Sequence, residues 1–391
     1  MTPARVRWSE SRSGRRVGDL AVGADRVVQL LASLNPTDAV SDFARELSAH
    51  ARSLGAVSVL VAARVHPTCA GEAVVAECVR PDRLAGPRDV LLYHHSIGAG
   101  LVGWVTRFPG RRVVVHHSVT PPMYFERWAP RLASAARVGI DELHELARVT
   151  GSAVGVSEFD VAEARAAGFT NVGLLPIGPS RPRLASRPAR SWLRRLRAHS
   201  GPRILCVGRL APNKRVELVL AAHALVARAL PGARLDVVGS DAGTEGYALA
   251  LRLLARDLGA PGVTFHGAVT DRQLAALFAA AAVMVSASAH EGCGLPLLEA
   301  MYHGVPVIAR AAAAVPETVG DAGLLIRGDD PGDWARAVLG VLLDGHLHAE
   351  LAAAGRARVA TRLATDLRGA LASLLVPRES ARGPGVVPQV P

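Results

Sequence analysis

The sequence predicts two α/β domains, each built on a parallel sheet, that face each other across a cleft. Short apolar strands alternate with helical patterns over most of the chain, which is typical of parallel βαβ units. A stretch rich in proline and arginine, residues 179–202, interrupts that alternation once and separates two similar halves. The length of 391 residues agrees with two domains of about 150 to 200 residues each.

The first alternation follows a basic tail and ends at the interrupting stretch. We expect strands within residues 26–34, 56–65, 88–98, 111–122, 152–160 and 171–178. We expect helices within residues 38–54, 100–106 and 161–167. Two of the strands, "RDVLLYHHSIG" and "RRVVVHHSVTPP", end in polar residues. Ligands bind beyond the carboxyl ends of parallel strands, so we expect the site in the cleft between the domains.

The second alternation begins after the linker, which carries a short basic helix. We expect strands within residues 203–210, 233–240, 263–269, 283–290, 305–310 and 323–327. We expect helices within residues 216–230, 244–258, 271–281, 295–303 and 331–343, and a helical region at 346–375. The predicted parts are a disordered basic tail (1–24), an N-terminal domain (25–180), a linker (181–202), a C-terminal domain (203–345), a C-terminal helical region (346–376) and a disordered tail (377–391).

The composition restricts the classes of partner. The net charge of +11 favours anionic partners. Nucleic acid is disfavoured, because the chain has neither interleaved basic and aromatic residues nor zinc-finger spacing. Four cysteines without a CxxC pair, a start without a signal peptide and the lack of a spanning apolar run predict a cytoplasmic protein. The stretches "SWLRRLRAHS" and "ERWAPRLASAARVG" leave two alternatives open, a peripheral contact with an anionic inner-membrane face or solvated basic surfaces.

A glycine-rich turn carries the strongest chemical signal. The stretch "SAHEGCGLPLLEAMYHGVPVIA" places a strand, a turn and a helix in succession, and Pro296 suits the first helical turn. We expect the N–H groups around Gly294, Leu295 and Leu297 to point outward and to form, with the helix dipole, a site for a diphosphate. Gly292 and Gly294 let a ligand approach the backbone closely.

Charged residues surround this turn. Glu291 and Glu299 flank it, and carboxylates pair well with the vicinal hydroxyls of a ribose or a hexose. Arg209 and Lys214, the only lysine in the chain, follow the first strand of the second domain and can neutralise a diphosphate. Surface charge is the alternative explanation for each pair taken alone, and the turn between the glutamates favours a nucleotide-sugar site.

These motifs resemble those of the family-4 retaining glycosyltransferases. "EGCGLPLLEAMYHGVPVIA" followed by "VPETVGDAGLLI" is similar to the family's E-x7-E signature, and "VGRLAPNK" is similar to its Gly-Arg…Lys element. "LLYHHSIG" and "VVVHHSVTPPMYF" resemble N-terminal motifs of one bacterial branch. The resemblance covers residues 26 to 345. It implies the GT-B fold, in which two Rossmann-like domains bind the acceptor (N-terminal) and the nucleotide-sugar donor (C-terminal).

The resemblance also implies a role for each matching position of the donor site. Glu299 would bind the ribose hydroxyls, Glu291 the donor hexose, and Arg209 with Lys214 the diphosphate. The remaining donor-binding positions would be Gly292, Cys293, Gly294, Leu295, Gly267 and Val269, the last two through their backbone beside the base. Cys293 departs from the family, which usually has an aromatic or bulky apolar residue there.

The N-terminal domain would supply the acceptor side. His117 would contact the transferred sugar, and His95 and Asp38 are candidate acceptor contacts. Since adjacent side chains of a strand alternate faces, at most one histidine of each adjacent pair reaches the ligand. The loop "LNPTDAVSD" lacks a glycine that many relatives carry, so its contacts are the least determined.

The implied reaction moves a hexose from a nucleotide diphosphate sugar to an acceptor hydroxyl with retention of configuration. The acceptor would be a sugar, a lipid-linked glycan or a small molecule. No DxD triplet occurs, so no metal is expected, and the nucleotide sugar is a co-substrate rather than a cofactor. Two alternatives stay open: a non-catalytic nucleotide-sugar binding protein and a GT-B epimerase that acts on the nucleotide sugar.

Overall fold

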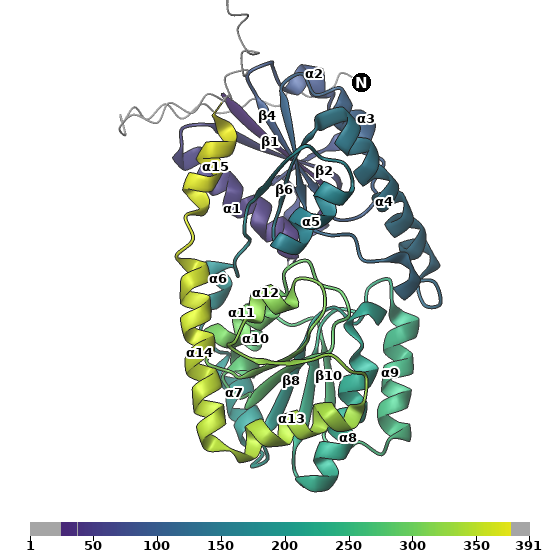
Figure 1. The fold of residues 1–391 in the computed structure, drawn as a ribbon, viewed down its shortest axis with the longest axis vertical. Coiled ribbons are helices and arrows are strands. Elements are labelled where there is room, and N and C mark those ends of the chain that lie inside the picture. Colours follow the sequence, from purple (N-terminus) through teal and green to yellow (C-terminus); the bar gives the residue numbers. More distant parts are fainter. Residues whose placement is uncertain (1–24, 37, 377–391) are drawn as a thin grey trace, which may run out of the picture.

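The computed structural model describes residues 25–36 and 38–376, which form two lobes stacked along the long axis of the molecule (Figure 1). The two expected disordered tails lie outside the described residues. Each lobe contains one parallel sheet with helices on both faces, and the chain passes from one lobe to the other through residues 175–202.

The N-terminal sheet has seven strands within the described residues, in the order β3-β2-β1-β4-β5-β6-β7. Its strands are β1 (Arg26–Leu34), β2 (Val57–Val65), β3 (Val74–Val75), β4 (Val90–His95), β5 (Arg111–His116), β6 (Ser152–Gly155) and β7 (Asn171–Leu174). Its helices are α1 (Ala39–Ser53), α2 (Pro81–Leu84), α3 (Val102–Thr106), α4 (Pro130–Thr150) and α5 (Glu158–Ala166). The long helix α4 was not expected from the sequence.

The C-terminal sheet has six strands within the described residues, in the order β10-β9-β8-β11-β12-β13. They are β8 (Arg203–Val207), β9 (Arg234–Val238), β10 (Val263–Gly267), β11 (Val283–Ser286), β12 (Val307–Arg310) and β13 (Leu324–Ile326). The helices that follow them are α8 (Val216–Ala229), α9 (Glu245–Asp257), α10 (Asp271–Phe278), α11 (Leu295–Tyr302), α12 (Val315–Val319) and α13 (Pro331–Leu343). The linker carries α6 (Arg181–Leu184) and α7 (Arg190–Arg197).

Both sheets share one topology. Numbered within its own half, each contains the order 3-2-1-4-5-6, which is the strand order of the Rossmann fold. The predicted fold class, two Rossmann-like domains, is therefore confirmed. The strand order reverses between β1 and β4 in the first sheet and between β8 and β11 in the second, and such switch points open the crevice that holds a ligand.

The C-terminal helical region connects the two lobes a second time. It is broken into α14 (Gly345–Leu363) and α15 (Leu367–Leu375), where one region at 346–375 was expected, and the Asp366 side chain caps the start of α15. Helix α14 packs against α11, and α15 packs against α1 of the other domain. Figure 1 shows this yellow segment running along the lower lobe and ending on the upper one.

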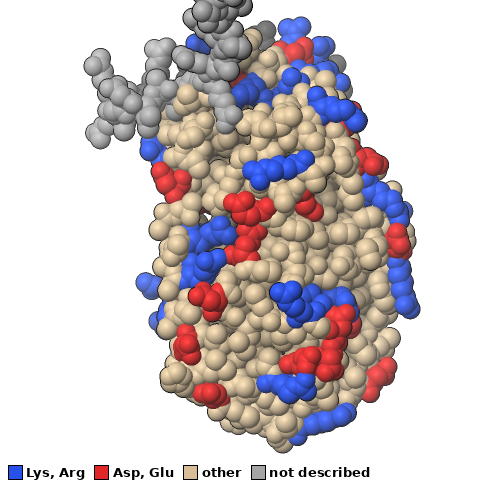
Figure 2. All heavy atoms as spheres, in the orientation of Figure 1, with Lys and Arg blue, Asp and Glu red and all other residues tan. Residues whose placement is uncertain are grey.

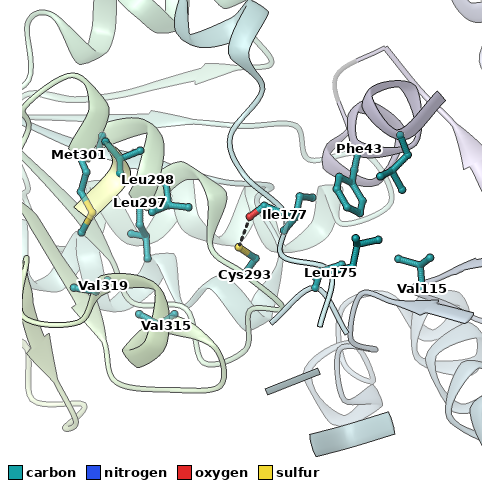
Figure 3. Close-up of a cluster of buried hydrophobic side chains, with 14 of the residues drawn as sticks. Phe43, Val115, Leu175, Ile177, Cys293, Leu297, Leu298, Met301, Val315 and Val319 are labelled. Carbon is teal, nitrogen blue, oxygen red and sulfur yellow. Dashed lines mark hydrogen bonds between the residues drawn. The ribbon is translucent and has the colours of Figure 1, made fainter. Parts of the chain in front are cut away.

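A buried apolar cluster joins the domains beside the linker (Figure 3). Phe43 and Leu175 enter it from the N-terminal side, and Leu297 and Met301 of α11 enter it from the C-terminal side. Cys293 lies between these groups. The donor-side helix α11 is thus anchored in an interface that both domains build.

The surface carries charge of both signs. Figure 2 shows lysine and arginine side chains interspersed with aspartate and glutamate, with no single-sign patch dominating that face. Within residues 25–36 and 38–376, no single helix combines the length and apolarity needed to cross a membrane. In the same described residues, only the helix pair 331–343 and 345–375, which is bent by 96°, has the length and composition of a membrane-spanning segment.

Candidate active site

The glycine-rich turn between β11 and α11 has the conformation that its glycines permit. Gly294 has φ 75°, a left-handed value that side chains with a Cβ rarely adopt, and Pro296 lies in the first turn of α11. One expectation is corrected: the Leu297 N–H donates to the Gly294 carbonyl at 2.9 Å, so it does not point outward unpaired. That bond closes the first turn, and any anion site here uses the amides before Leu297.

Lys214 and Glu291 meet at the switch point of the C-terminal sheet. Lys214 ends a 3-10 turn (Pro212–Lys214) that follows β8, and Glu291 follows β11. The Lys214 Nζ lies 2.5 Å from Glu291 Oε1, and both side chains are mostly buried. Asn213 fastens the two loops, because its carbonyl accepts from Ala289 N at 2.8 Å and its Nδ2 donates to the His290 carbonyl at 3.2 Å.

Arg209 of the C-terminal domain and Asp38 of the N-terminal domain lie close enough to interact electrostatically. The exposed Arg209 donates through Nη2 to the Ala242 carbonyl at 2.9 Å, on the loop after β9. Asp38 caps α1 and accepts from the amide and the hydroxyl of Ser41 at 3.0 and 2.8 Å. The expected contacts of Arg209 with a diphosphate and of Asp38 with an acceptor stay predictions.

Glu299 lies buried on α11, one turn after the start of the helix. Burial raises the pKa of its carboxyl, and the guanidinium of Arg183 opposes that rise. Arg183 Nη1 lies 3.3 Å from Glu299 Oε1, and the other guanidinium nitrogens bind Asp42 at 2.6 Å and Asp271 at 3.2 Å. Arg183 could not be predicted from the sequence, because nothing in the linker pattern distinguishes it from its neighbouring arginines.

Four histidines at the ends of β4 and β5 form two stacked pairs, as the alternation of side chains requires. His94 stacks with His117, and His95 stacks with His116. His95 is fully buried, with its Nδ1 3.4 Å from that of His116. His95 therefore lies apart from the pair that contains His117, and its expected acceptor contact stays a prediction.

Hydrogen bonds fix the tautomer of His117. Gln29 donates through Nε2 to Ala44 and Ser48, so its Oε1 accepts from His94 Nε2 at 2.9 Å. Desolvation lowers the pKa of His94 to about 3, so His94 is neutral and its Nδ1 accepts. The His117 Nε2, 3.0 Å away, is then the donor. Burial and the neighbouring imidazoles lower the pKa of His117 as well, so its Nδ1 is left as an acceptor.

A polar network connects the two domains beside these histidines. Glu163 Oε2 accepts from the Ser118 hydroxyl at 2.7 Å and lies 3.1 Å from His116 Nε2. The Ser118 hydroxyl is also 3.2 Å from Nε2 of His290, which precedes Glu291 on the C-terminal domain. The network therefore links the acceptor-side strand β5 to the donor-side turn.

One group of side chains in the described residues has the spacing of a metal site. Ligand atoms of His116, Asp160 and Glu163 lie within 4.8 Å of one another. The Asp160 carboxyl is fully buried, and burial raises its pKa to about 8. Without a cation, this carboxyl is therefore largely protonated at neutral pH, and a cation that bound here would have to displace that proton.

Cys293 and the base-side loop complete the predicted positions. The Cys293 thiol is buried 3.9 Å from the Ile177 carbonyl, and burial raises its pKa to about 12, which makes a reactive-thiol role unfavourable. Gly292 lies against the backbone of His117 across the domain boundary, and Leu295 is half-buried. Gly267 has φ 68° and accepts from Gly239 N at 2.9 Å, and Val269 packs on the core.

Sequence comparisons identify the relatives of this chain. Residues 201–344 match the family described as glycosyl transferases group 1. A GDP-mannose-dependent alpha-(1-6)-phosphatidylinositol monomannoside mannosyltransferase from Mycobacterium tuberculosis is 32% identical over 346 residues, which cover 77% of this chain and 86% of the relative. A D-inositol 3-phosphate glycosyltransferase from Mycobacterium avium is 41% identical over 141 residues, covering 35% of this chain and 32% of the relative.

Solved structures share the fold over nearly the whole chain. Anabaena HepE in complex with UDP-glucose has a TM-score of 0.71 at 18% identity, covering 90% of this chain and 99% of that chain. WaaG, a glycosyltransferase involved in lipopolysaccharide biosynthesis, has a TM-score of 0.69 at 18% identity, covering 89% and 99%. The two-domain architecture is the GT-B fold, and the chain belongs to the group 1 glycosyltransferases.

Proposed function

We propose that the chain transfers a hexose from a nucleoside diphosphate sugar to an acceptor hydroxyl, with retention of the anomeric configuration. The observation that carries this proposal is the Lys214–Glu291 pair at the switch point of the C-terminal sheet, with the buried Glu299 on the adjoining helix. A cation beside two carboxylates on either side of a glycine-rich turn suits a diphosphate with a sugar at each end.

In the proposed reaction, negative charge develops on the diphosphate as the glycosidic bond breaks. Lys214 would then exchange part of its contact with Glu291 for the leaving phosphate, and Arg209 would add a second cation from the edge of the cleft. These cations lower the barrier only to the extent that they bind the transition state more tightly than the ground state. Glu291, released from full pairing, would accept hydroxyls of the hexose.

His117 would contact the transferred sugar from the N-terminal domain. Because His117 is neutral, it can bind a hydroxyl without adding positive charge to the reacting centre. The acceptor hydroxyl would approach on the face from which the phosphate leaves and give its proton to that phosphate. This route forms no covalent bond between the sugar and the protein, and it keeps the anomeric configuration.

We further propose that the transfer needs no divalent metal at the diphosphate, since Lys214, Arg209 and the start of α11 supply positive charge there. Undiminished turnover in excess EDTA supports this part of the proposal, and a loss of turnover that Mg²⁺ or Mn²⁺ restores contradicts it. The polar network around Asp160 lies on the acceptor side, so EDTA sensitivity should be compared with that of the Asp160→Asn variant.

A donor and acceptor panel tests the transfer itself. GDP-mannose is the first donor, because the mycobacterial relative is GDP-mannose-dependent, with UDP-glucose and ADP-glucose beside it. Phosphatidylinositol monomannoside, inositol phosphate and short mannosides serve as acceptors. The expected result is a thermal stabilisation by one donor and a glycosylated product whose new linkage has the donor's anomeric configuration.

Other outcomes of the panel separate the alternatives. A donor that binds without turnover on any acceptor indicates a non-catalytic nucleotide-sugar binding protein. An isomerised donor with no transfer product indicates an epimerase. A product of inverted configuration contradicts the retaining mechanism and leaves the transfer intact.

A further inference from the structure

Arg183 connects three carboxylates that belong to different parts of the molecule. It lies on the short linker helix α6. Its guanidinium contacts Glu299 on α11, Asp271 at the start of α10 and Asp42 on α1 of the N-terminal domain. The three contacts use three different nitrogens at 3.3, 3.2 and 2.6 Å, which a planar five-donor guanidinium allows and an ammonium group does not.

The contact with Glu299 matters because that side chain is only 4% exposed. A carboxylate in such a place is stable only with a compensating cation, and the described residues place Arg183 there. The contact engages Oε1, so Oε2 lies outside the pair. A ribose hydroxyl can therefore donate to the same carboxylate while the guanidinium keeps it charged.

A pocket of about 1000 Å³ opens next to Arg183, between α1, residues 176–183 and the α14–α15 junction. Asp271 and Leu295 line it together with Arg183. Leu295 and Glu299 are four residues apart on α11 and therefore share one helix face. Glu299 itself does not line the pocket, so Arg183 is the residue that contacts both the pocket and the buried carboxylate.

We propose that Arg183 is a positioning residue for the donor: it holds Glu299 ionised in its buried place and ties it, through Asp42, to the N-terminal domain. This inference rests on the donor site proposed above and assigns a linker residue to it. One guanidinium therefore contacts carboxylates of both domains.

The charged groups that act on Glu299 are known from the structure. Arg183 lowers the pKa of Glu299, whereas Asp271, Asp42 and the dominant effect of burial raise it. Arg358 of α14, the helix packed against α11, donates instead to the carbonyls of Glu317 and Thr318. Removal of Arg183 therefore raises the pKa of Glu299 further, and the variant holds a neutral acid at pH values where the wild type holds a carboxylate.

Nucleotide binding measured by calorimetry from pH 6 to pH 9 tests the inference, with GDP, UDP and ADP as probes. In Arg183→Gln, binding should weaken about tenfold for each unit by which the pKa of Glu299 exceeds the pH, and it should recover as the pH rises. Arg183→Lys keeps a positive charge beside Glu299 and should therefore shift the pH profile less than Arg183→Gln does. Arg194→Gln, the same change at an exposed position of the second linker helix α7 and away from the pocket, is the matched control.

A second measurement does not depend on the nucleotide. The free energy of unfolding of Arg183→Gln should fall, relative to the wild type, as the pH rises, because an unpaired buried carboxylate must ionise. This additional slope should disappear in Arg183→Gln combined with Glu299→Gln, which separates Glu299 from Asp42 and Asp271. If no nucleotide binds the wild type, the proposed donor site fails, and the unfolding data still decide whether Arg183 holds Glu299 ionised.

The inference is overturned by either of two results. The first is nucleotide binding by Arg183→Gln that either equals the wild-type affinity at every pH or is weaker by the same factor at every pH. Each of these outcomes would mean that the charge on Glu299 does not depend on Arg183. Likewise, an unfolding slope that survives in the double variant assigns the effect to another carboxylate.

Discussion

A Cβ atom at position 292 would lie 2.7 Å from the carbonyl oxygen of His117, so Gly292 and His117 touch across the domain boundary. Real Cβ atoms do not approach a backbone oxygen this closely, and a larger residue must push the two segments apart. The glycine-rich turn is thus shaped by the opposite domain as well as by a ligand.

Gly292→Ala should reduce turnover at least tenfold while the protein stays folded. The added methyl group forces the donor turn and the His117 segment apart by several tenths of an ångström, and catalysis is sensitive to displacements of that size. Initial rates with the donor identified in the panel, together with the unfolding midpoint, measure both effects. Gly340→Ala in α13 is the control, because a Cβ there meets nothing within 4 Å. Full activity of Gly292→Ala contradicts a close approach of the domains during turnover.

Lys214 should be essential for turnover, and its shape should matter as well as its charge. Lys214→Ala and Glu291→Gln should each lower kcat about 100-fold or more, the effect typical of a lost group that stabilises developing charge. Lys214→Arg should lose about tenfold, because a planar guanidinium does not fit the place of a point charge 2.5 Å from a carboxylate. Wild-type kcat in Lys214→Ala rules out the diphosphate assignment.

The same residue allows a direct binding test, since Lys214 is the only lysine in the chain. An amine-directed acylating reagent can modify this side chain and the N-terminal amine alone. A bound nucleotide sugar should slow the acylation of Lys214 several-fold and leave the rate at the N-terminus unchanged. Equal rates with and without the donor, at a donor concentration that stabilises the protein, place the diphosphate elsewhere.

The proximity of Lys214 and Glu291 could be predicted from the sequence because both follow strands at one switch point, which a strand-turn-helix pattern reveals. Helix α4 was not predicted from the sequence, because the first half of the helix buries only small residues. Gly139 packs on the backbone of Gly98, and Ala133 and Ala136 fill the interface with residues 119–129 and 211. An alanine and glycine face gives little hydrophobic periodicity.

The role of Arg183 could not be predicted for a different reason. Its three partners come from three elements that are far apart in the sequence, and only the tertiary fold brings them together. The E-x7-E spacing places Glu299 near the turn, but no local pattern shows which cation meets it. The error at Leu297 has a local cause instead. Its amide was expected to point outward unpaired, but it closes the helical turn that Gly294 begins.

Glu317 caps a helix of the other domain, and removing it should weaken the interface. Its two carboxylate oxygens accept from the amides of Glu158 and Phe159, at 2.9 and 3.0 Å, at the start of α5. Glu317→Ala should lower the free energy of unfolding by about 1 to 2 kcal/mol, the usual effect of a lost cap that also complements a helix dipole. Urea denaturation measures this effect. Glu350→Ala on α14, where the carboxylate is 69% exposed, should change it by less than about 0.5 kcal/mol. Equal effects of the two variants would show that the cap does not contribute.

The buried Asp160 should make stability depend on pH. The pKa of its carboxyl is about 8 in the folded protein and about 3.9 in an unfolded chain. The folded state therefore keeps a proton that the unfolded chain has released, so this group's contribution to stability is full below pH about 4 and is lost as the pH rises through 8. Asp160→Asn keeps a neutral side chain of the same shape and should remove that dependence.

Urea denaturation of the wild type and Asp160→Asn at intervals from pH 5 to pH 8.5 measures the difference. The variant should gain stability relative to the wild type steadily over this range, because the wild type approaches the ionisation of an unpaired carboxyl. Asp257→Asn makes the same chemical change at an exposed position of α9 and should give curves parallel to the wild type. If Asp160→Asn also gives parallel curves, the carboxyl is ionised in the folded state across the range, and the His116–Asp160–Glu163 group then carries the negative charge that a cation needs.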